Sequence, residues 1–285
     1  MATMTDDVRV SGGAGLSFER LDAPFGVVVR GIDWDNPRED EVMLVKQAFR
    51  RHLLIVFRGQ ASPTYEQKDN FFARFGRKMM DTFDGAFHYN LFNRDEKAAI
   101  FRKGDGNYLV NGEGGTSELI WHTDHNHKPQ IKTISVLEAL EFEKGAAPTQ
   151  FRDSYTAYEL LPTDLRQRVE NRQAVYFDPR LPGPEENPRL CDAMHPVVMI
   201  HPESGRRCLY VMDYTSRIVG MSVEESDVLI AELQAFSGKY APFYSHEWEV
   251  GDLVMWDNVG LQHMRPAVEN NARRVLRQYE GVAEA

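Results

Sequence analysis

Apolar residues recur along the chain in two patterns, one typical of helices and one typical of strands. Residues 39–52 carry Val42, Val45 and Phe49 at helical spacing, which predicts an amphipathic helix. The next run, residues 53–57, is apolar throughout and ends at a polar Arg-Gly pair, which predicts a short buried strand. The N-terminal part of the chain is therefore expected to mix helices and strands.

Capping signals locate further helices. Ser222 and Glu225 have the spacing of a capping box, so we expect a helix from there to about Phe236. Asp153 is a suitable N-cap for a helix that runs through Leu161, where a proline follows. Both signals satisfy backbone N–H groups that lack partners in the first turn of a helix.

The rest of the chain is dominated by short predicted strands. We expect them within residues 16–34 and at 119–121, 133–140, 196–200, 208–212, 247–256 and 274–279. Many short strands joined by turns are typical of jelly rolls and barrels. The expected fold class is therefore mainly β with flanking helices.

Neither a linker nor a repeat divides the chain. Residues 1–15 are polar and are expected to form a disordered tail, so residues 16–285 are predicted to form a single domain. Residues 84–118 are rich in Gly and Asn and predict a long loop, and residues 177–188 contain four prolines and predict a loop or lid. Long loops in compact domains are often functional.

Composition and charge narrow the function classes. The formal net charge is −10, from 33 basic and 43 acidic residues, which argues against nucleic acid because phosphate contacts need a basic surface. The chain has two cysteines and a polar N-terminus, and no stretch approaches the roughly 18 consecutive apolar residues of a membrane span. We therefore expect a cytoplasmic protein without nucleic-acid or membrane partners. Homo-oligomer formation stays open.

The segment 121–127 concentrates residues that bind metals. On a strand, residues i and i+2 project from one face, so His122 and Asp124 can present an imidazole and a carboxylate side by side. A second histidine from a neighbouring strand would complete a facial triad, the arrangement typical of non-heme iron(II) oxygenases. His125 and His127 are an alternative metal pair, and a solvated surface cluster is a further alternative.

The C-terminal part of the chain carries a second group of motifs. Residues 251–258 spell Gly-Asp-Leu-Val-Met-Trp-Asp-Asn, His263 follows, and Arg274 lies eleven positions beyond it (274 − 263 = 11). With the Trp-His-x-Asp of residues 121–124, these motifs resemble the taurine and chlorophenoxyacetate dioxygenase family of iron(II)- and α-ketoglutarate-dependent oxygenases. The resemblance spans about residues 16–280, with the motifs in the family order.

The resemblance implies a double-stranded β-helix, or jelly roll, in which His122, Asp124 and His263 are the iron ligands. It also implies that Arg274 pairs with the distal carboxylate of α-ketoglutarate, a role that suits the planar guanidinium fork. Thr149 matches the family threonine that hydrogen-bonds the same carboxylate. The Gly-Gly-Asp that usually precedes this threonine is Ala-Ala-Pro here.

The substrate side departs from the well-studied members. Those members carry a further arginine four residues after the position of Arg274, where it binds the acidic group of the substrate, and here that residue is Gln278. Arg277 is adjacent, but neighbouring strand residues face opposite ways. A sulfonate or aryloxyacetate substrate is therefore not implied, and Gln278 could hydrogen-bond a neutral or zwitterionic group. Tyr214 matches an aromatic position on the family's pocket wall, with a core tyrosine as the alternative.

In the family reaction, α-ketoglutarate and molecular oxygen are consumed, succinate and carbon dioxide are released, and a C–H bond of a small organic substrate is hydroxylated or otherwise oxidised. Asp124 favours such an oxidation over halogenation, because related halogenases lack this carboxylate. Two alternatives are a non-catalytic metal-binding jelly-roll module and a zinc hydrolase that uses the same three ligands. Neither explains Arg274 at its family position.

Overall fold

The computed structural model describes residues 15–60, 62–75, 77–78, 118–177, 193–267 and 272–282. Nearly all of the predicted N-terminal tail, of the irregular stretch at 84–118 and of the proline-rich stretch at 177–188 lies outside these residues. The tail, the loop and the lid therefore stay predictions, as does the single domain from residue 16 to residue 285.

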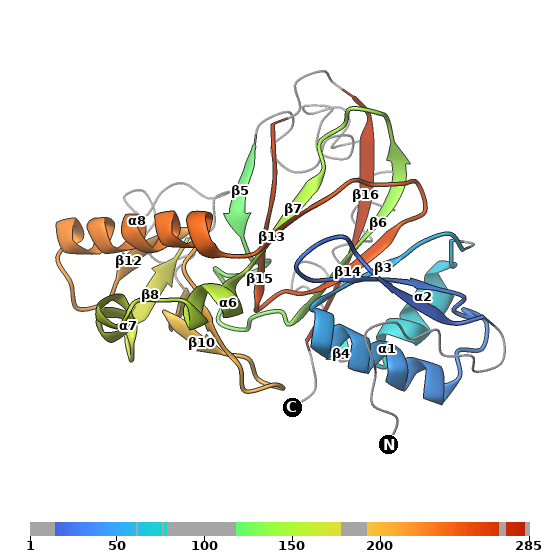
Figure 1. Ribbon diagram of the computed structural model, residues 1–285, viewed down its shortest axis with the longest axis horizontal. Coiled ribbons are helices and arrows are strands. Elements are labelled where there is room, and N and C mark those ends of the chain that lie inside the picture. Colours follow the sequence, from blue (N-terminus) through green and yellow to red (C-terminus); the bar gives the residue numbers. More distant parts are fainter. Residues whose placement is uncertain are drawn as a thin grey trace.

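A large sheet forms one half of the fold. Within the described residues it has seven strands in the order β1-β2-β3-β14-β6-β16-β4. Their bounds are β1 Ser17–Arg20, β2 Val27–Arg30, β3 Leu54–Phe57, β14 Leu253–Asp257, β6 Ile134–Phe142, β16 Arg274–Val282 and β4 Arg77–Lys78. Because β14 and β16 pair antiparallel with the two edges of β6, the C-terminal segments lie in the middle of this sheet (Figure 1).

A second sheet supplies the other half. Within the described residues it has four strands in the order β13-β7-β15-β5, namely β13 Phe243–His246, β7 Thr149–Asp153, β15 Leu261–Arg265 and β5 Leu119–His122. Side chains from both sheets meet in one hydrophobic cluster, for example Phe151 of β7, Leu261 of β15 and Trp256 of β14. Two mainly antiparallel sheets packed on a shared core confirm the predicted jelly roll.

Smaller elements flank the two sheets. The strands β12 Thr215–Ile218, β8 Gln173–Tyr176 and β9 Ala193–Pro196 form one small sheet, and β10 Val198–Ile200 and β11 Arg207–Leu209 form another. The helices are α1 Glu39–His52, α2 Tyr65–Phe72, α6 Ser154–Glu159, α7 Thr163–Val169 and α8 Val223–Tyr240. In Figure 1, α1 and α2 lie beside the large sheet, and α6, α7 and α8 group with the small sheets at the other end of the molecule.

Helix boundaries follow the capping signals closely. The capping box of Ser222 and Glu225 is present at the start of α8, which extends beyond the predicted Phe236. The Asp153 side chain accepts hydrogen bonds from two backbone N–H groups at the start of α6. The helix α1 has the predicted bounds, and the left-handed φ of 65° at Leu53 ends it, so the following strand begins one residue later than predicted.

The strand predicted at residues 247–256 is wrong over its first half. The extended segments are β13, at 243–246, and β14, which begins at Leu253. Between them Gly251 has a φ of +92°, a left-handed conformation that glycine adopts without a steric cost and that interrupts an extended chain. The apolar residues before this turn therefore do not continue the strand.

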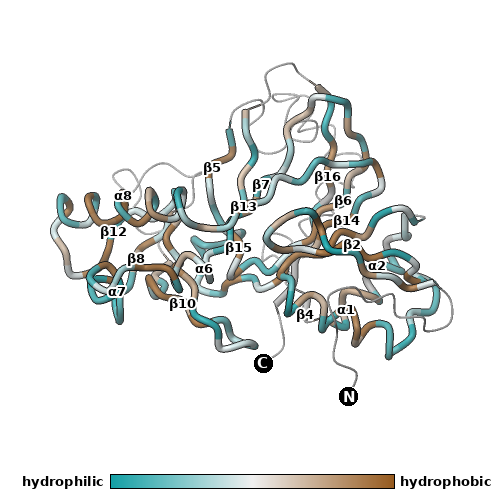
Figure 2. Tube along the Cα trace, in the orientation of Figure 1, coloured by the Kyte–Doolittle hydropathy of each residue, from teal (hydrophilic) through white to brown (hydrophobic). Residues whose placement is uncertain are grey.

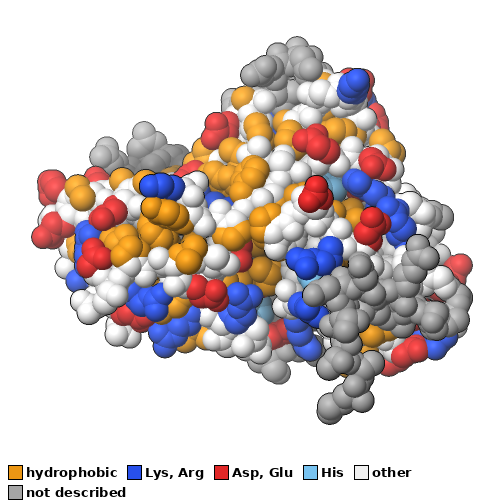
Figure 3. Space-filling view, in the orientation of Figure 1, with side chains coloured by type: hydrophobic (Ala, Val, Ile, Leu, Met, Phe, Trp, Pro, Cys, Tyr) orange, Lys and Arg blue, Asp and Glu red, His pale blue; other side chains and the backbone are white. Residues whose placement is uncertain are grey.

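The distribution of hydrophobic residues agrees with this architecture. Along α8, hydrophobic and hydrophilic bands alternate, as expected for a helix with one buried face (Figure 2). On the face shown in Figure 3, hydrophobic side chains gather where α8 approaches the central strands. In the part of the chain that the structure describes, no helix is long and apolar enough to span a membrane.

Candidate active site

Two histidines from adjacent strands lie side by side inside the jelly roll. The strand β15 pairs antiparallel with β5, and His263 is directly opposite His122 in the register. The two imidazole rings have centroids 4.2 Å apart, and both side chains are buried. The second histidine therefore comes from a neighbouring strand, as the facial-triad hypothesis requires.

Asp124 reaches the same place by a different route from the one expected. The strand β5 ends at His122, so Asp124 lies in a turn, and strand alternation does not explain its orientation. Its backbone is held instead by Asn258, which accepts a hydrogen bond from the Asp124 N–H at 2.9 Å and donates one to the Asp124 carbonyl at 3.1 Å. Asn258 lies between β14 and β15, so the segment that carries His263 also holds Asp124.

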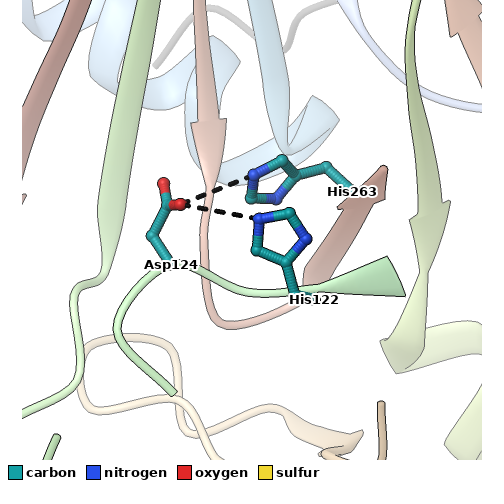
Figure 4. A group of neighbouring side chains, drawn as sticks. All are labelled: His122, Asp124 and His263. Carbon is teal, nitrogen blue, oxygen red and sulfur yellow. Dashed lines mark ion pairs between the residues drawn. The ribbon is translucent and has the colours of Figure 1, made fainter. Parts of the chain in front are cut away.

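The three side chains converge on a common point (Figure 4). Asp124 Oδ1 is 3.6 Å from His263 Nε2 and 3.9 Å from His122 Nε2. One ligand atom from each residue lies within 4.8 Å of the others, and among the described residues this is the group that could hold a metal ion. Because both distances exceed those of good hydrogen bonds, the three groups face one another without bonding directly.

The protonation states suit metal ligands. The His122 Nδ1–H donates to the Ile120 carbonyl at 2.7 Å, which leaves the lone pair on Nε2 facing Asp124. Burial, followed by the neighbouring His263, lowers the pKa of His122 to about 3, so the imidazole is neutral at physiological pH. Burial alone would raise the pKa of Asp124, but His263 and Lys132 hold it well below its usual range. The site thus combines a neutral imidazole with an ionised carboxylate.

The outer oxygen of Asp124 has two hydrogen-bond donors. Ser135 of β6 donates from Oγ to Asp124 Oδ2 at 2.5 Å, and Gln278 of β16 donates from Nε2 to the same oxygen at 2.9 Å. Neither Ser135 nor Asn258 was identified from the sequence as a site residue. A short serine in an apolar strand carries no signal of its own, and Asn258 was recognised only as part of a motif.

A buried arginine lies on the same strand as Gln278. Arg274 donates from Nη2 to Thr149 Oγ1 at 2.8 Å, and Trp248 donates from Nε1 to the same hydroxyl oxygen at 3.0 Å. Burial, together with the charge of the nearby Arg265, lowers the pKa of Arg274 to about 9. Arg274 Nε is buried without a hydrogen-bond partner, and among the described residues no acidic side chain contributes to the electrostatic environment of this guanidinium. A buried cation without a counter-ion among the described residues would be stabilised by a carboxylate ligand that binds beside it.

The alternative metal pair, His125 and His127, makes other contacts. His125 Nε2 is 2.7 Å from the buried ammonium of Lys132, which competes with any metal cation at that nitrogen. His127 lies beside His125, with ring centroids 5.8 Å apart, but the two do not belong to the converging group. Tyr214 is buried next to the site, with its ring centroid 5.6 Å from that of His122.

The sequence model of the "Taurine catabolism dioxygenase TauD, TfdA family" matches residues 17–279. The chain belongs to this family. It is therefore an enzyme, an oxidoreductase of the α-ketoglutarate-dependent dioxygenase class.

Similar proteins support this assignment along almost the whole chain. Pentalenolactone F synthase of Streptomyces avermitilis is 31% identical over 303 residues, covering 98% of this chain and 94% of that protein. The (S)-phenoxypropionate/alpha-ketoglutarate-dioxygenase of Sphingobium herbicidovorans is 29% identical, covering 90% and 91%. The solved structure of AAD-2 in complex with Mn(II) and N-oxalylglycine has a TM-score of 0.74 at 22% identity, covering 95% and 98%, and shows the same fold.

Proposed function

We propose that His122, Asp124 and His263 hold iron(II), and that Arg274 and Thr149 bind the distal carboxylate of α-ketoglutarate. The observation that carries this proposal is the convergence of two imidazoles and one carboxylate on a common point at 3.6 and 3.9 Å. Two histidines and one carboxylate on one face of an octahedral metal leave positions open, the donor set typical of non-heme iron(II) oxygenases. When bound, iron(II) with α-ketoglutarate would supply oxygen activation and oxidation of a substrate C–H bond.

The pairing of Thr149 with Arg274 supports the α-ketoglutarate site. The Thr149 hydroxyl oxygen already accepts hydrogen bonds from Arg274 and Trp248, so its own proton is available to an external acceptor. A carboxylate between the Thr149 hydroxyl and the Arg274 guanidinium would receive hydrogen bonds from both. The same carboxylate would neutralise the buried guanidinium, which the described residues leave without a counter-ion.

Aromatic side chains shield the histidines from water. The His263 ring stacks against Phe151 at a centroid distance of 6.2 Å and meets the Trp256 ring edge to face at 4.9 Å. Phe151 and Trp256 are fully buried, so they exclude solvent from one side of the site and restrict the orientation of the imidazole. A dry, rigid site strengthens the electrostatic interactions of the residues that line it.

The zinc hydrolase and the non-catalytic module are not favoured. Both would use the three converging side chains, but neither requires a buried arginine and threonine that together receive a carboxylate. The reaction class that uses both groups is the one expected of the family.

For the substrate, we propose a small organic molecule that is not anchored through an acidic group at Gln278. The Gln278 amide is hydrogen-bonded to Asp124. Burial of an anion without a cationic partner is costly, and an amide offsets only part of that cost. The relatives include a pentalenolactone F synthase and a phenoxypropionate dioxygenase, so related sites act on small molecules of different chemistry. The two cysteines and the net charge of −10 favour a cytoplasmic protein with a small-molecule partner.

Two measurements test the metal and co-substrate sites. Protein reconstituted with Fe(II) is expected to release succinate from α-ketoglutarate, and Mn(II)-loaded protein is expected to bind the non-reactive analogue N-oxalylglycine by calorimetry. His122→Ala should abolish both signals, whereas His201→Gln, at a comparably buried histidine outside the converging group, should retain them. Full N-oxalylglycine binding by His122→Ala would contradict the proposal.

The substrate proposal has its own test. Wild type and Gln278→Arg are compared on taurine and chlorophenoxyacetate, with succinate release coupled to substrate loss. We expect no coupled turnover by wild type. Efficient wild-type turnover of either acid would show that an anion is held by another residue.

A further inference from the structure

We infer that Gln278 is a positioning residue for Asp124, and that with Ser135 it reserves Oδ1 of that carboxylate for the metal. This inference rests on the proposed metal site and goes beyond it, because it gives a role to the position where the resembling enzymes carry a substrate-binding arginine. The role concerns the metal ligand and not the substrate.

The two donors come from neighbouring strands of the large sheet. Gln278 of β16 is directly opposite Leu137 of β6, and Ser135 lies two residues before Leu137 on the same strand. Residues opposite each other in an antiparallel pair, and residues two apart on one strand, share a face of the sheet. Ser135 and Gln278 are therefore diagonal neighbours, and both point across the jelly roll to Asp124, which follows a strand of the other sheet.

Chemistry fixes the orientation of the Gln278 amide. An ionised carboxylate has only acceptor sites, so the Nε2 nitrogen and not the Oε1 oxygen must face Asp124. The geometry agrees, because both groups that contact Asp124 Oδ2 present donors, the Ser135 hydroxyl and the Gln278 amide nitrogen. The Gln278 amide therefore contacts Asp124 through its N–H donor, and the flipped amide, with its oxygen facing the carboxylate, is excluded.

The two hydrogen bonds give the two oxygens of the Asp124 carboxylate different roles. Both end on Oδ2, so the lone pairs of this oxygen are largely used. The Ser135 contact of 2.5 Å is in the range of a strong O–H···O⁻ hydrogen bond. Oδ1 is the oxygen that faces His122 and His263, so it remains free to bind a cation. A carboxylate that contributes one oxygen leaves more metal positions open than one that contributes two.

The choice of an amide at residue 278 is consistent with this role. A guanidinium at the same distance would form an ion pair with Asp124 and reduce the negative charge that the carboxylate offers to a metal. The neutral amide orients the carboxylate and leaves its charge intact. Outer-sphere hydrogen bonds of this kind typically change metal affinity by 10- to 100-fold.

The test measures Mn(II) affinity, which does not depend on turnover. Mn(II) is titrated into the metal-free full-length protein by calorimetry, and electron paramagnetic resonance of the bound ion reports on its ligand environment. Gln278→Met removes the donor at similar volume, and Gln278→Glu keeps the shape but replaces the donor by an acceptor. We expect Mn(II) affinity to fall about tenfold or more in Gln278→Met and further in Gln278→Glu. Ser135→Ala should lower it by a similar factor.

Controls separate this role from a structural one and from failure of the metal site. Gln60→Met removes a partly buried amide whose oxygen accepts a hydrogen bond from the Ile32 N–H, and should leave Mn(II) affinity unchanged. His122→Ala should abolish binding, and an unaffected His122→Ala would overturn the proposed metal site itself. If His122→Ala abolishes binding while both Gln278 variants fold and bind Mn(II) like wild type, the positioning role is overturned and the metal site stands.

Discussion

Among the described residues, the histidine–aspartate clusters around Asp252 and Asp124 differ in how the carboxylate is satisfied. Asp252 accepts hydrogen bonds from Arg58 at 2.7 and 2.5 Å, from His246 at 3.1 Å and from the Glu249 N–H at 2.9 Å. These four contacts match the roughly four lone-pair sites of a carboxylate. Tyr244 hydrogen-bonds the other nitrogen of His246 at 2.9 Å. This cluster is therefore complete within the protein.

The cluster of His122, Asp124 and His263 is incomplete by the same measure. Asp124 Oδ2 has two donors, but Oδ1 has none within hydrogen-bond distance among the described residues and faces two imidazole nitrogens instead. A buried carboxylate normally finds its partners inside the protein. The two clusters therefore share residue types and differ in the number of satisfied carboxylate lone pairs, which supports the proposed metal site at Asp124.

The largest effect is expected from breaking the incomplete cluster. Because a lost first ligand weakens binding more than a lost outer hydrogen bond, His122→Ala should reduce Mn(II) affinity by more than about 100-fold. It should also remove the rise in melting temperature that Mn(II) gives to wild type, since a ligand stabilises only the state that binds it. Thermal denaturation of wild type and of His122→Ala, each with and without Mn(II), measures this shift in melting temperature. An unchanged Mn(II)-dependent shift in His122→Ala would transfer the site to another part of the chain.

The buried arginine provides the next largest effect. Losing a charged partner of a buried carboxylate costs on the order of 2–5 kcal/mol, so Arg274→Met should raise the α-ketoglutarate requirement by more than about tenfold. Arg58→Met is the matched control, because it removes an arginine from the complete cluster. The control should lose stability and keep the wild-type requirement in succinate-release assays. Equal requirements in Arg274→Met and wild type would mean that another residue binds the co-substrate.

The complete cluster should respond in stability and not in binding. Asp252→Asn removes the anion between Arg58 and His246 and leaves Arg58 only its ion pair with the exposed Glu249, so we expect a loss of about 2–3 kcal/mol in the free energy of unfolding. The value lies below that of a fully buried pair, because the Arg58 side chain is 21% exposed. Urea denaturation measures this loss, and Mn(II) titration should give an affinity close to that of wild type. A strong loss of Mn(II) affinity would mean that the two clusters are coupled.

The smallest effect concerns acid stability at His246. Burial lowers the pKa of His246 below its ordinary value of 6.5, although the facing Asp252 raises it, and Arg58, Tyr244 and Glu247 are the other groups around it. The unfolded chain therefore takes up a proton near pH 6.5 that the folded protein does not, so stability falls as the pH drops below this value. The slope from one such group is at most about 1.4 kcal/mol per pH unit. His246→Gln should reduce the slope of the unfolding free energy just below pH 6.5, and an unchanged slope would assign the proton uptake elsewhere.

The sequence predicted the helical elements well where local chemistry decides them. The helix α1 and the capping box of α8 depend on residues within one or two turns of each other, and both are present as predicted. The strand at 247–256 was predicted wrongly because apolar composition does not reveal that Gly251 adopts a left-handed conformation. The strand β13 and several short strands were missed for the related reason that strand pairing is decided by distant partners.

In the candidate site as well, local motifs predict the residues, whereas the contacts between distant residues are seen only in the folded chain. His122, Asp124, His263, Thr149 and Arg274 were named from motifs, and the structure brings the first three together and links the last two by a hydrogen bond. The contact from Gln278 to Asp124 joins residues 154 positions apart, and the clamp by Asn258 joins residues 134 positions apart. No local pattern encodes such pairs, so Gln278 was interpreted as a substrate residue only.

What the sequence determined by itself is the set of chemical groups and the family to which the chain belongs. Motif spacing along one strand or one turn carries this information, because the residues concerned are close in the chain. The tertiary structure alone decided which histidine–aspartate cluster is satisfied internally and which has an oxygen without a hydrogen-bond donor among the described residues. That distinction depends on donors supplied across the jelly roll by β6 and β16, and hydrogen bonds of this kind form only when both sheets have been assembled.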